Sequence, residues 1–128
     1  MKQLRYLPIV LILTLSNRFF CQSHKGKCGL EIEKAYTQNV LGKSVGYYVE
    51  FKNNAGQDVD AIEWKAKFYN NFGEYKGEKD GQWSSGNIIK PIKPGAVTKD
   101  LETNWVDGAT KVFITVKRVH LAQTGTCK

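Results

Sequence analysis

Few residues in this chain have the types and spacing that acid–base or nucleophilic chemistry requires. The 128-residue sequence contains only two histidines, His24 and His120. A hydrolytic triad needs a histidine held between a nucleophile and a carboxylate, and only His120 falls in a patterned segment. An outward position on a strand is the simpler interpretation of His120. We assign no catalytic residue and expect a non-enzymatic protein, with a small secreted hydrolase using His120 as an alternative.

Residues that could bind a metal or a cofactor are equally scarce. Structural zinc sites use four closely spaced ligands, and Cys28, Cys127 and the two histidines could gather only if the cysteines were not bridged. Paired carboxylates such as Asp58 and Asp60 lie in turn-like sequence near lysines, whereas glycosidases set two carboxyl groups across a cleft. We therefore predict no metal site and no cofactor.

Aromatic residues are the best candidates for ligand contacts. Trp83, Trp105 and Tyr75 fall at outward or loop positions when the alternation of the sequence is followed. Exposed aromatic side chains are what sugar stacking or a protein partner would use. The alternative is that Trp83 and Trp105 cap the ends of a hydrophobic core.

The N-terminus resembles an export signal. Lys2 and Arg5 precede an apolar run, 7–15, which is shorter than the roughly 20 residues that a spanning helix needs. We predict a signal peptide over 1–23, a single domain over 24–128, no transmembrane helix, and a secreted or periplasmic location. In the alternative, Cys21 carries a lipid anchor, although the bulky, charged segment 18–20 is unlike a lipoprotein signal.

Charge and cysteine content describe the expected mature domain. Removing Lys2, Arg5 and Arg18 and no acids lowers the formal net charge from +7 to +4 and leaves both signs interspersed. Such a surface argues against nucleic-acid binding. In an oxidising compartment we expect Cys28 and Cys127 to form a disulfide, whose loop the chain-entropy model values at about 4.7 kcal/mol at most.

Alternating apolar residues predict strands. In 62–68 every even position is apolar and every odd one charged, and 45–52 and 112–116 alternate in the same way. The phase slips before Val119, which predicts a β-bulge near Lys117. The predicted core residues are Trp64, Phe68, Ile62, Val49, Phe51, Ile114 and Val116.

Together the strands predict an all-β fold, an immunoglobulin-like antiparallel β-sandwich of about six to seven strands. We place them at 30–37, 45–53, 60–70, 82–89, 96–102 and 111–121. Six up-and-down strands return the chain to its starting end, so that Cys127 could meet Cys28. A seventh would leave it at the other end and make the bridge hard to form.

Several short motifs resemble the FxLYD-type family of small extracytoplasmic sandwich domains from bacterial envelope and secreted proteins. Segment 49–54 is similar to that family's second strand, which ends in asparagine. Segment 66–70 stands where the namesake motif would be, keeping Tyr69 but lacking the first Phe. Lys93-Pro94-Gly95 and the strand 112–121 resemble its turn and closing strand. The resemblance implies a binding or interaction role and carries over no catalytic residues.

We therefore expect a secreted or periplasmic binding domain whose partner is an unidentified protein or carbohydrate. The mixed surface charge, the outward aromatics and the missing catalytic constellation motivate this expectation. An alternative is a protease inhibitor presenting the loop 70–81 to an active-site cleft.

Overall fold

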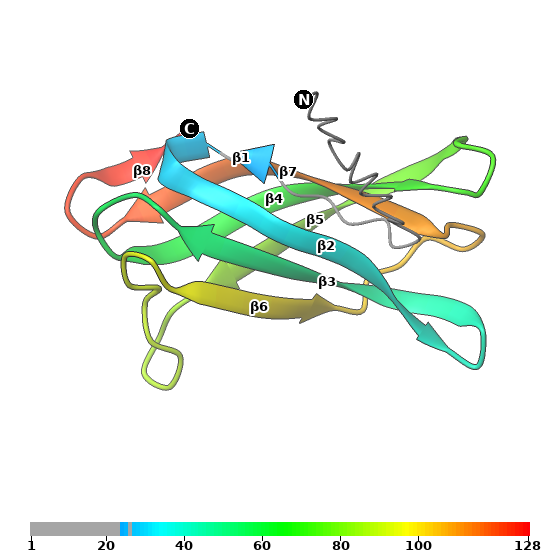
Figure 1. The fold of residues 1–128 in the computed structure, drawn as a ribbon, viewed down its shortest axis with the longest axis horizontal. Helices are drawn as coiled ribbons and strands as arrows, with labels where there is room; N and C mark the ends of the chain where they lie inside the picture. The colour runs from blue at the N-terminus through cyan, green and yellow to red at the C-terminus, as the bar shows by residue number, and fades with distance from the viewer. Residues whose placement is uncertain (1–23, 26) are drawn as a thin grey trace, which may run out of the picture.

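Strands dominate the computed structural model, which describes residues 24, 25 and 27–128 (Figure 1). One antiparallel sheet has the order β1 (His24–Lys25), β2 (Leu30–Val40), β3 (Lys43–Asn53), β6 (Val97–Glu102). The other has the order β5 (Tyr75–Ser84), β4 (Val59–Tyr69), β7 (Lys111–Leu121), β8 (Gly125–Cys127). A 3-10 turn, η1 (Lys27–Gly29), precedes β2, and no helix of the described part is long and apolar enough to cross a membrane. The predicted all-β sandwich is confirmed. The expected signal peptide and Cys21 lie outside the described residues.

The core forms where the inward residues of the two sheets meet. All seven predicted core residues are buried, because alternation sends every second side chain of a strand to the same face. Val45 departs from the pattern and is 38% exposed. Gln38 pairs with Gly46 and Asn39 with Ser44, so Val45 is an extra residue in the β2–β3 ladder and turns away from the core.

Trp64 ties the two sheets together at the centre of this core. Its Nε1 donates a hydrogen bond of 2.9 Å to the hydroxyl oxygen of Tyr47 in the facing sheet. Burial raises the pKa of Tyr47 well above the ordinary range. The indole ring lies against Gly81 of β5, where an added Cβ would come within 2.1 Å of ring atoms. Only glycine fits beneath the ring at this position.

Two β-bulges interrupt the β4–β7 ladder. Trp64 pairs with Val116 and Glu63 with Arg118, which leaves Lys117 as the extra residue and confirms the predicted bulge. A second register shift leaves Asp60 as the extra residue between Val59 and Ala61. Bulges change where neighbouring side chains point, and these two lie at either end of a short paired stretch.

The fourth strand lies earlier in the chain than predicted. It was expected over 82–89, but β5 spans Tyr75–Ser84 and pairs with β4 along its length. Ile88 and Ile89 belong to the following loop and are exposed. This edge strand carries mostly charged residues and glycines, so it lacks the apolar alternation that marked the others.

The disulfide between Cys28 and Cys127 is present, with a Cα–Cα distance of 6.0 Å. The six long strands bring the chain back to the end where β2 began, as expected. The structure adds β8 after them, but this strand is only three residues long. Cys127 therefore lies close to that end, and the expectation that a seventh strand would make the bridge hard to form was wrong. We call this end of the sandwich the disulfide end.

The opposite end, which we call the hairpin end, carries two hairpin turns, one from each sheet, and the connection between β6 and β7 (Figure 1). The β2–β3 turn consists of Leu41 and Gly42, both with positive φ, as a tight two-residue hairpin requires. Leucine is unusual in this conformation, and the Leu41 side chain is fully exposed. The β4–β5 turn spans 70–74 and carries Phe72.

Candidate binding surfaces

The three aromatic residues predicted to contact a ligand do not share one surface. Trp83 is only 6% exposed and belongs to the core, so its predicted outward position was wrong. Trp105 is half-buried and packs edge-on against Phe68, with ring centroids 4.9 Å apart. Both tryptophans therefore contribute to the core, as the capping alternative proposed. Tyr75 alone is well exposed, at 53%.

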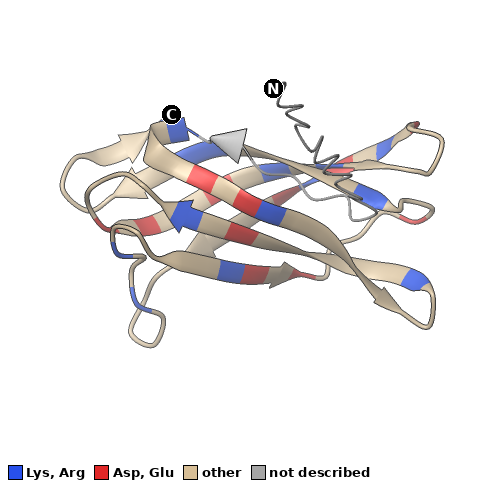
Figure 2. Cartoon of the chain, in the orientation of Figure 1, with Lys and Arg blue, Asp and Glu red and all other residues tan. Residues whose placement is uncertain are grey.

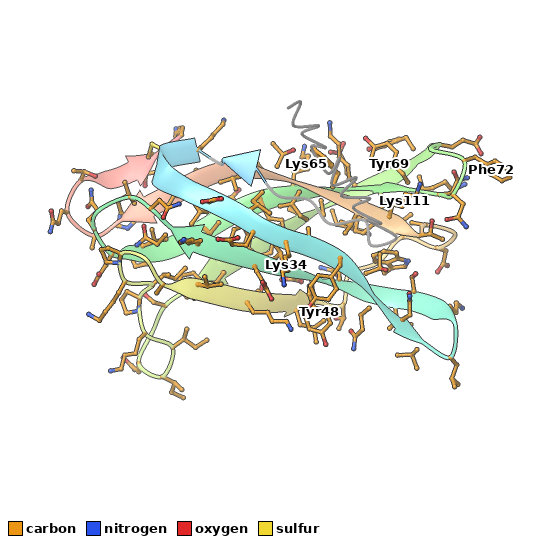
Figure 3. The ribbon with its side chains drawn as sticks, viewed as in Figure 1. Lys34, Tyr48, Lys65, Tyr69, Phe72 and Lys111 are labelled. Atoms are coloured by element: carbon orange, nitrogen blue, oxygen red, sulfur yellow. A yellow bond between two sulfur atoms is a disulfide. The ribbon has the colours of Figure 1, made fainter. Side chains whose placement is uncertain are left out.

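Tyr75 belongs to a cluster that we call the aromatic patch, made of Tyr69, Phe72, Tyr75 and Phe113. The rings of Tyr69 and Tyr75 meet edge to face, with centroids 5.9 Å apart. Phe72 is 88% exposed and Phe113 is 47% exposed. In Figure 3, Tyr69 and Lys111 lie near each other toward the hairpin end of the second sheet, and Phe72 lies beyond them at the tip of the β4–β5 turn. Tyr69, Phe113 and Lys111 also line a shallow depression of about 290 Å³.

The turn that presents Phe72 is held by Asn70. The Asn70 side-chain oxygen accepts hydrogen bonds from the backbone N–H groups of Phe72 and Glu74, at 3.0 and 2.9 Å. Its amide nitrogen donates to the Glu74 carboxylate at 2.9 Å. An asparagine side chain often stabilises a turn by bonding to the backbone two residues further along the chain. The turn is therefore ordered while its aromatic side chain faces solvent.

A second aromatic group lies on the outer face of the other sheet. The rings of Tyr36 and Tyr48 stack with centroids 5.1 Å apart, and Lys99 Nζ lies 4.5 Å from the Tyr48 centroid. A hydrogen bond with Tyr36 raises the pKa of Lys99. Because the lysine already covers these ring faces, this cluster is a less open platform than the aromatic patch.

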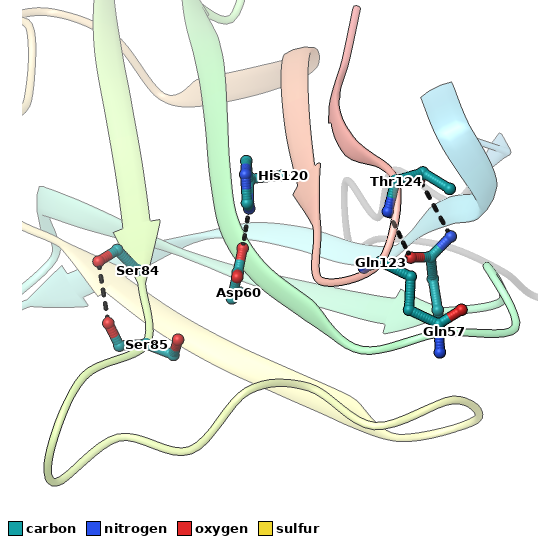
Figure 4. A network of polar contacts seen from close by, with 7 residues as sticks. All are labelled: Gln57, Asp60, Ser84, Ser85, His120, Gln123 and Thr124. Atoms are coloured by element: carbon teal, nitrogen blue, oxygen red, sulfur yellow. Dashed lines mark hydrogen bonds and ion pairs between the residues drawn. The ribbon is translucent and has the colours of Figure 1, made fainter.

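Polar residues gather on the outer face of the second sheet, between the two bulges. His120 Nδ1 is hydrogen bonded to the carboxylate of Asp60, the bulged residue of β4 (Figure 4). The two side chains are 46% and 30% exposed, respectively. A hydrolytic site would also need a hydroxyl bonded to the imidazole. No such bond is found among the described residues, so only half of that arrangement is present.

Next to this pair, Glu63 joins an ion-pair network on the same face. Its carboxylate accepts a hydrogen bond from Arg118 Nε and lies 3.3 Å from Lys117 Nζ. Lys117 also lies 3.6 Å from Asp80 of β5. The hydrogen bond from Arg118, and to a smaller extent the one from Lys117, holds the pKa of Glu63 below its ordinary value. Lys117 reaches both acids because it is the bulged residue of β7.

Positive and negative residues are interspersed over the strands (Figure 2). Within the part of the chain that the structure describes, no three histidine, cysteine, aspartate or glutamate side chains gather as metal ligands would. Comparison of the chain with models of protein families, with curated proteins and with solved structures found no match.

Proposed function

We propose that this protein is a non-enzymatic extracytoplasmic binding domain that contacts a protein or carbohydrate partner through the aromatic patch. One observation carries the proposal. Tyr69, Tyr75 and Phe113 lie close together on strands near the hairpin end, and the adjacent turn, where residues are ordinarily polar, exposes Phe72. Exposed aromatic clusters mark interaction sites, because each ring can bury a large apolar area at little entropic cost.

The position of the patch supports this role. The crosslink between Cys28 and Cys127 lies at the disulfide end, where β1 pairs with Glu31 and Ile32 of β2. The aromatic patch lies at the other end, away from the crosslink. In immunoglobulin variable domains, binding loops likewise cluster at one end of a sandwich.

The strand order also supports an immunoglobulin-like assignment. The sheets β2-β3-β6 and β5-β4-β7-β8 correspond to the orders A-B-E and C′-C-F-G. Trp64 stands on the strand equivalent to C, where antibody domains carry their buried tryptophan. The disulfide differs, because it joins the 3-10 turn before β2 to β8 rather than linking strands B and F. Export of the chain and its resemblance to FxLYD-type domains are part of the same proposal.

Capture experiments with matched variants test the aromatic patch. Mature protein would be used to probe a glycan array and to capture partners from secretions of its source. Phe72→Ser should reduce binding at least about tenfold, as for a central contact residue. Ile88→Ser removes an equally exposed apolar side chain from a loop at the disulfide end and should leave binding unchanged. Equal effects of the two variants, or no partner in either assay, would count against the proposal.

The alternative functions have less support from the geometry. Most of the segment expected to form an inhibitory loop, 70–81, belongs to β5, which leaves only the short turn 70–74 for a protease cleft. A hydrolase would need a hydroxyl and an oxyanion site beside His120. Inhibition of a broad protease panel, or hydrolysis of ester substrates that His120→Gln abolishes, would favour one of these alternatives.

A further inference from the structure

The outer face of the second sheet contains a hollow of about 260 Å³ that is separate from the aromatic patch. Two rows of cross-strand neighbours border it. Ser84 pairs with Ala61, Ala61 with His120, and His120 with Thr126, while Glu63 pairs with both Gln82 and Arg118. Directly opposite residues point to the same face of a sheet. Because Ala61 is small, space remains above it between larger polar side chains.

Hydrogen bonding in the hollow is asymmetric. Both oxygens of Glu63 are engaged by cations, one by Arg118 and the other by Lys117. Asp60 already contacts His120 Nδ1. The acids that border the hollow are therefore occupied by neighbouring side chains. Acceptors in this site are largely used by the protein itself.

Hydrogen-bond donors of the hollow, in contrast, are only partly engaged by other protein groups. Arg118 contacts Glu63 through Nε, and among the described residues neither of its Nη nitrogens has a hydrogen bond. His120 uses Nδ1 for Asp60, which leaves Nε2 for the hollow that the ring lines. Arg118 and His120 are two positions apart on one face of β7. A carboxylate behind each side chain fixes its orientation, much as carboxylates orient the ligands of built binding sites.

We propose that this hollow binds a single oxyanion group, a carboxylate or a phosphate, between the Arg118 guanidinium and the His120 imidazole. Guanidinium nitrogens match the spacing of two oxyanion oxygens. Gln82 and Thr126 line the same hollow and can add neutral donors. This site is independent of the proposed role of the aromatic patch.

Charged side chains from three strands surround the hollow. Asp60 and Glu63 of β4 and Asp80 of β5 face Lys117 and Arg118 of β7, and Thr126 of β8 is neutral. Three carboxylates thus oppose two cations. Neutral His120 donates through Nδ1 to Asp60 and presents Nε2 as an acceptor, whereas protonated His120 donates through both nitrogens. The protonated form is therefore the one that can bond to Asp60 and to an oxyanion together.

Titration by NMR with two probes, acetate and inorganic phosphate, tests the site. At pH 6, saturable shifts are expected at the backbone amides of Ala61, Arg118 and His120, with a Kd on the order of millimolar. The better of the two probes identifies the group. Arg118→Gln and Ala61→Leu, which fills the hollow without changing charge, should each weaken binding about tenfold or more. Lys65→Gln removes a cation from the same face outside the hollow lining and should change affinity by less than about twofold.

His120→Gln removes the imidazole that lines the hollow and should weaken oxyanion binding while leaving the amide spectrum otherwise native. If Arg118→Gln does not fold, Arg118→Lys keeps the charge but loses the paired donors and should still weaken binding. Shifts that never saturate, or equal affinity in wild type and Ala61→Leu, would overturn the proposal.

Discussion

Trp64 combines three roles that only its surroundings explain. Its ring fills the centre of the core, its Nε1 satisfies the buried Tyr47 hydroxyl oxygen, and its edge covers Gly81 of the neighbouring strand. A buried indole N–H usually finds such a partner, because an unpaired donor in the core would be costly. The residue therefore fixes the distance between the sheets as well as filling the core.

Replacing Gly81 with alanine tests this packing. The added methyl group would overlap the Trp64 ring, so the Gly81→Ala variant should lose roughly 1–3 kcal/mol of unfolding free energy, as overpacked cores do. Gly86→Ala is the matched control, because a Cβ there meets nothing within 4 Å and the backbone has no positive φ. Urea unfolding of both variants provides the measurement. Equal stability of the two would show that the ring does not constrain Gly81.

At the scale of single residues, the sequence identified core residues more accurately than residues of the proposed binding surface. Alternation identified the buried residues of β3, β4 and β7, and the phase slip before Val119 revealed the Lys117 bulge. The same signal marks the Asp60 bulge, since Val59 and Ile62 are both buried although they lie three positions apart. Phe113 could have been found, because inward Val112 and Ile114 leave it facing outward. Phe72 could not, because only the folded turn shows where its side chain points.

Among the strands, β6 is unusual in carrying carboxyl groups on its inward side. Asp100 pairs with buried Val49 and Glu102 with buried Tyr47. Burial is the main cause that raises the pKa of each carboxyl group, and the neighbouring Asp100 raises the pKa of Glu102 further. A folded-state pKa above the unfolded value means that the protonated form stabilises the fold.

The raised pKa values of Asp100 and Glu102 predict how the stability of the fold depends on pH. The contribution of the pair is fully present below the unfolded pKa values, 3.8 and 4.5, and is lost as the pH rises through the raised folded values. The double variant Asp100→Asn, Glu102→Gln should therefore gain stability relative to wild type at pH 7 and little at pH 4. Urea midpoints at both pH values measure this. A gain confined to pH 4 would contradict the assignment, and Glu63→Gln, whose pKa is lowered, should show the opposite trend.

Strand prediction succeeded where a strand is buried on one face and failed at the edges of the sheets. Central β4 and β7 alternate clearly, because their inward sides meet the opposing sheet. Edge strand β5 is held mainly by backbone pairing with β4, and glycine or charged residues fill most of its positions. Apolar Ile88 and Ile89 suggested a strand but lie in an exposed loop. Alternation in the sequence marks strands that are buried on one face, and edge strands bury too few side chains to show it.

Over the whole molecule, the disulfide links the first and last parts of the sandwich. Its loop spans 99 positions, so its removal should release substantial entropy in the unfolded state. A Cys28→Ser, Cys127→Ser variant should lose roughly 2–5 kcal/mol of unfolding free energy. Reduction of the wild-type protein should lower its urea midpoint similarly. A change below about 0.5 kcal/mol would mean that the sheets alone hold these ends together.

The two ends of the molecule differ in what they can offer a partner. The disulfide end brings together the crosslink and buried Asn53, whose side-chain nitrogen donates to the carbonyl oxygens of Gln57 and Ile92 at 2.7 and 2.8 Å. The hairpin end carries the aromatic patch and exposed Leu41. From the sequence we predicted that outward aromatic residues would form a binding surface. Two of the three residues named, Trp83 and Trp105, pack in or against the core instead.

Hydroxyl-radical footprinting of the mature protein, with and without its captured partner, tests the binding surface most directly. Protection of Tyr69, Phe72, Tyr75 and Phe113 is expected, because partner atoms would exclude solvent from these rings. Ile88 and Ile89, which are exposed in the loop at the disulfide end, should react equally in both samples. Protection of these two isoleucines with no change in the aromatic patch would contradict the proposed binding surface.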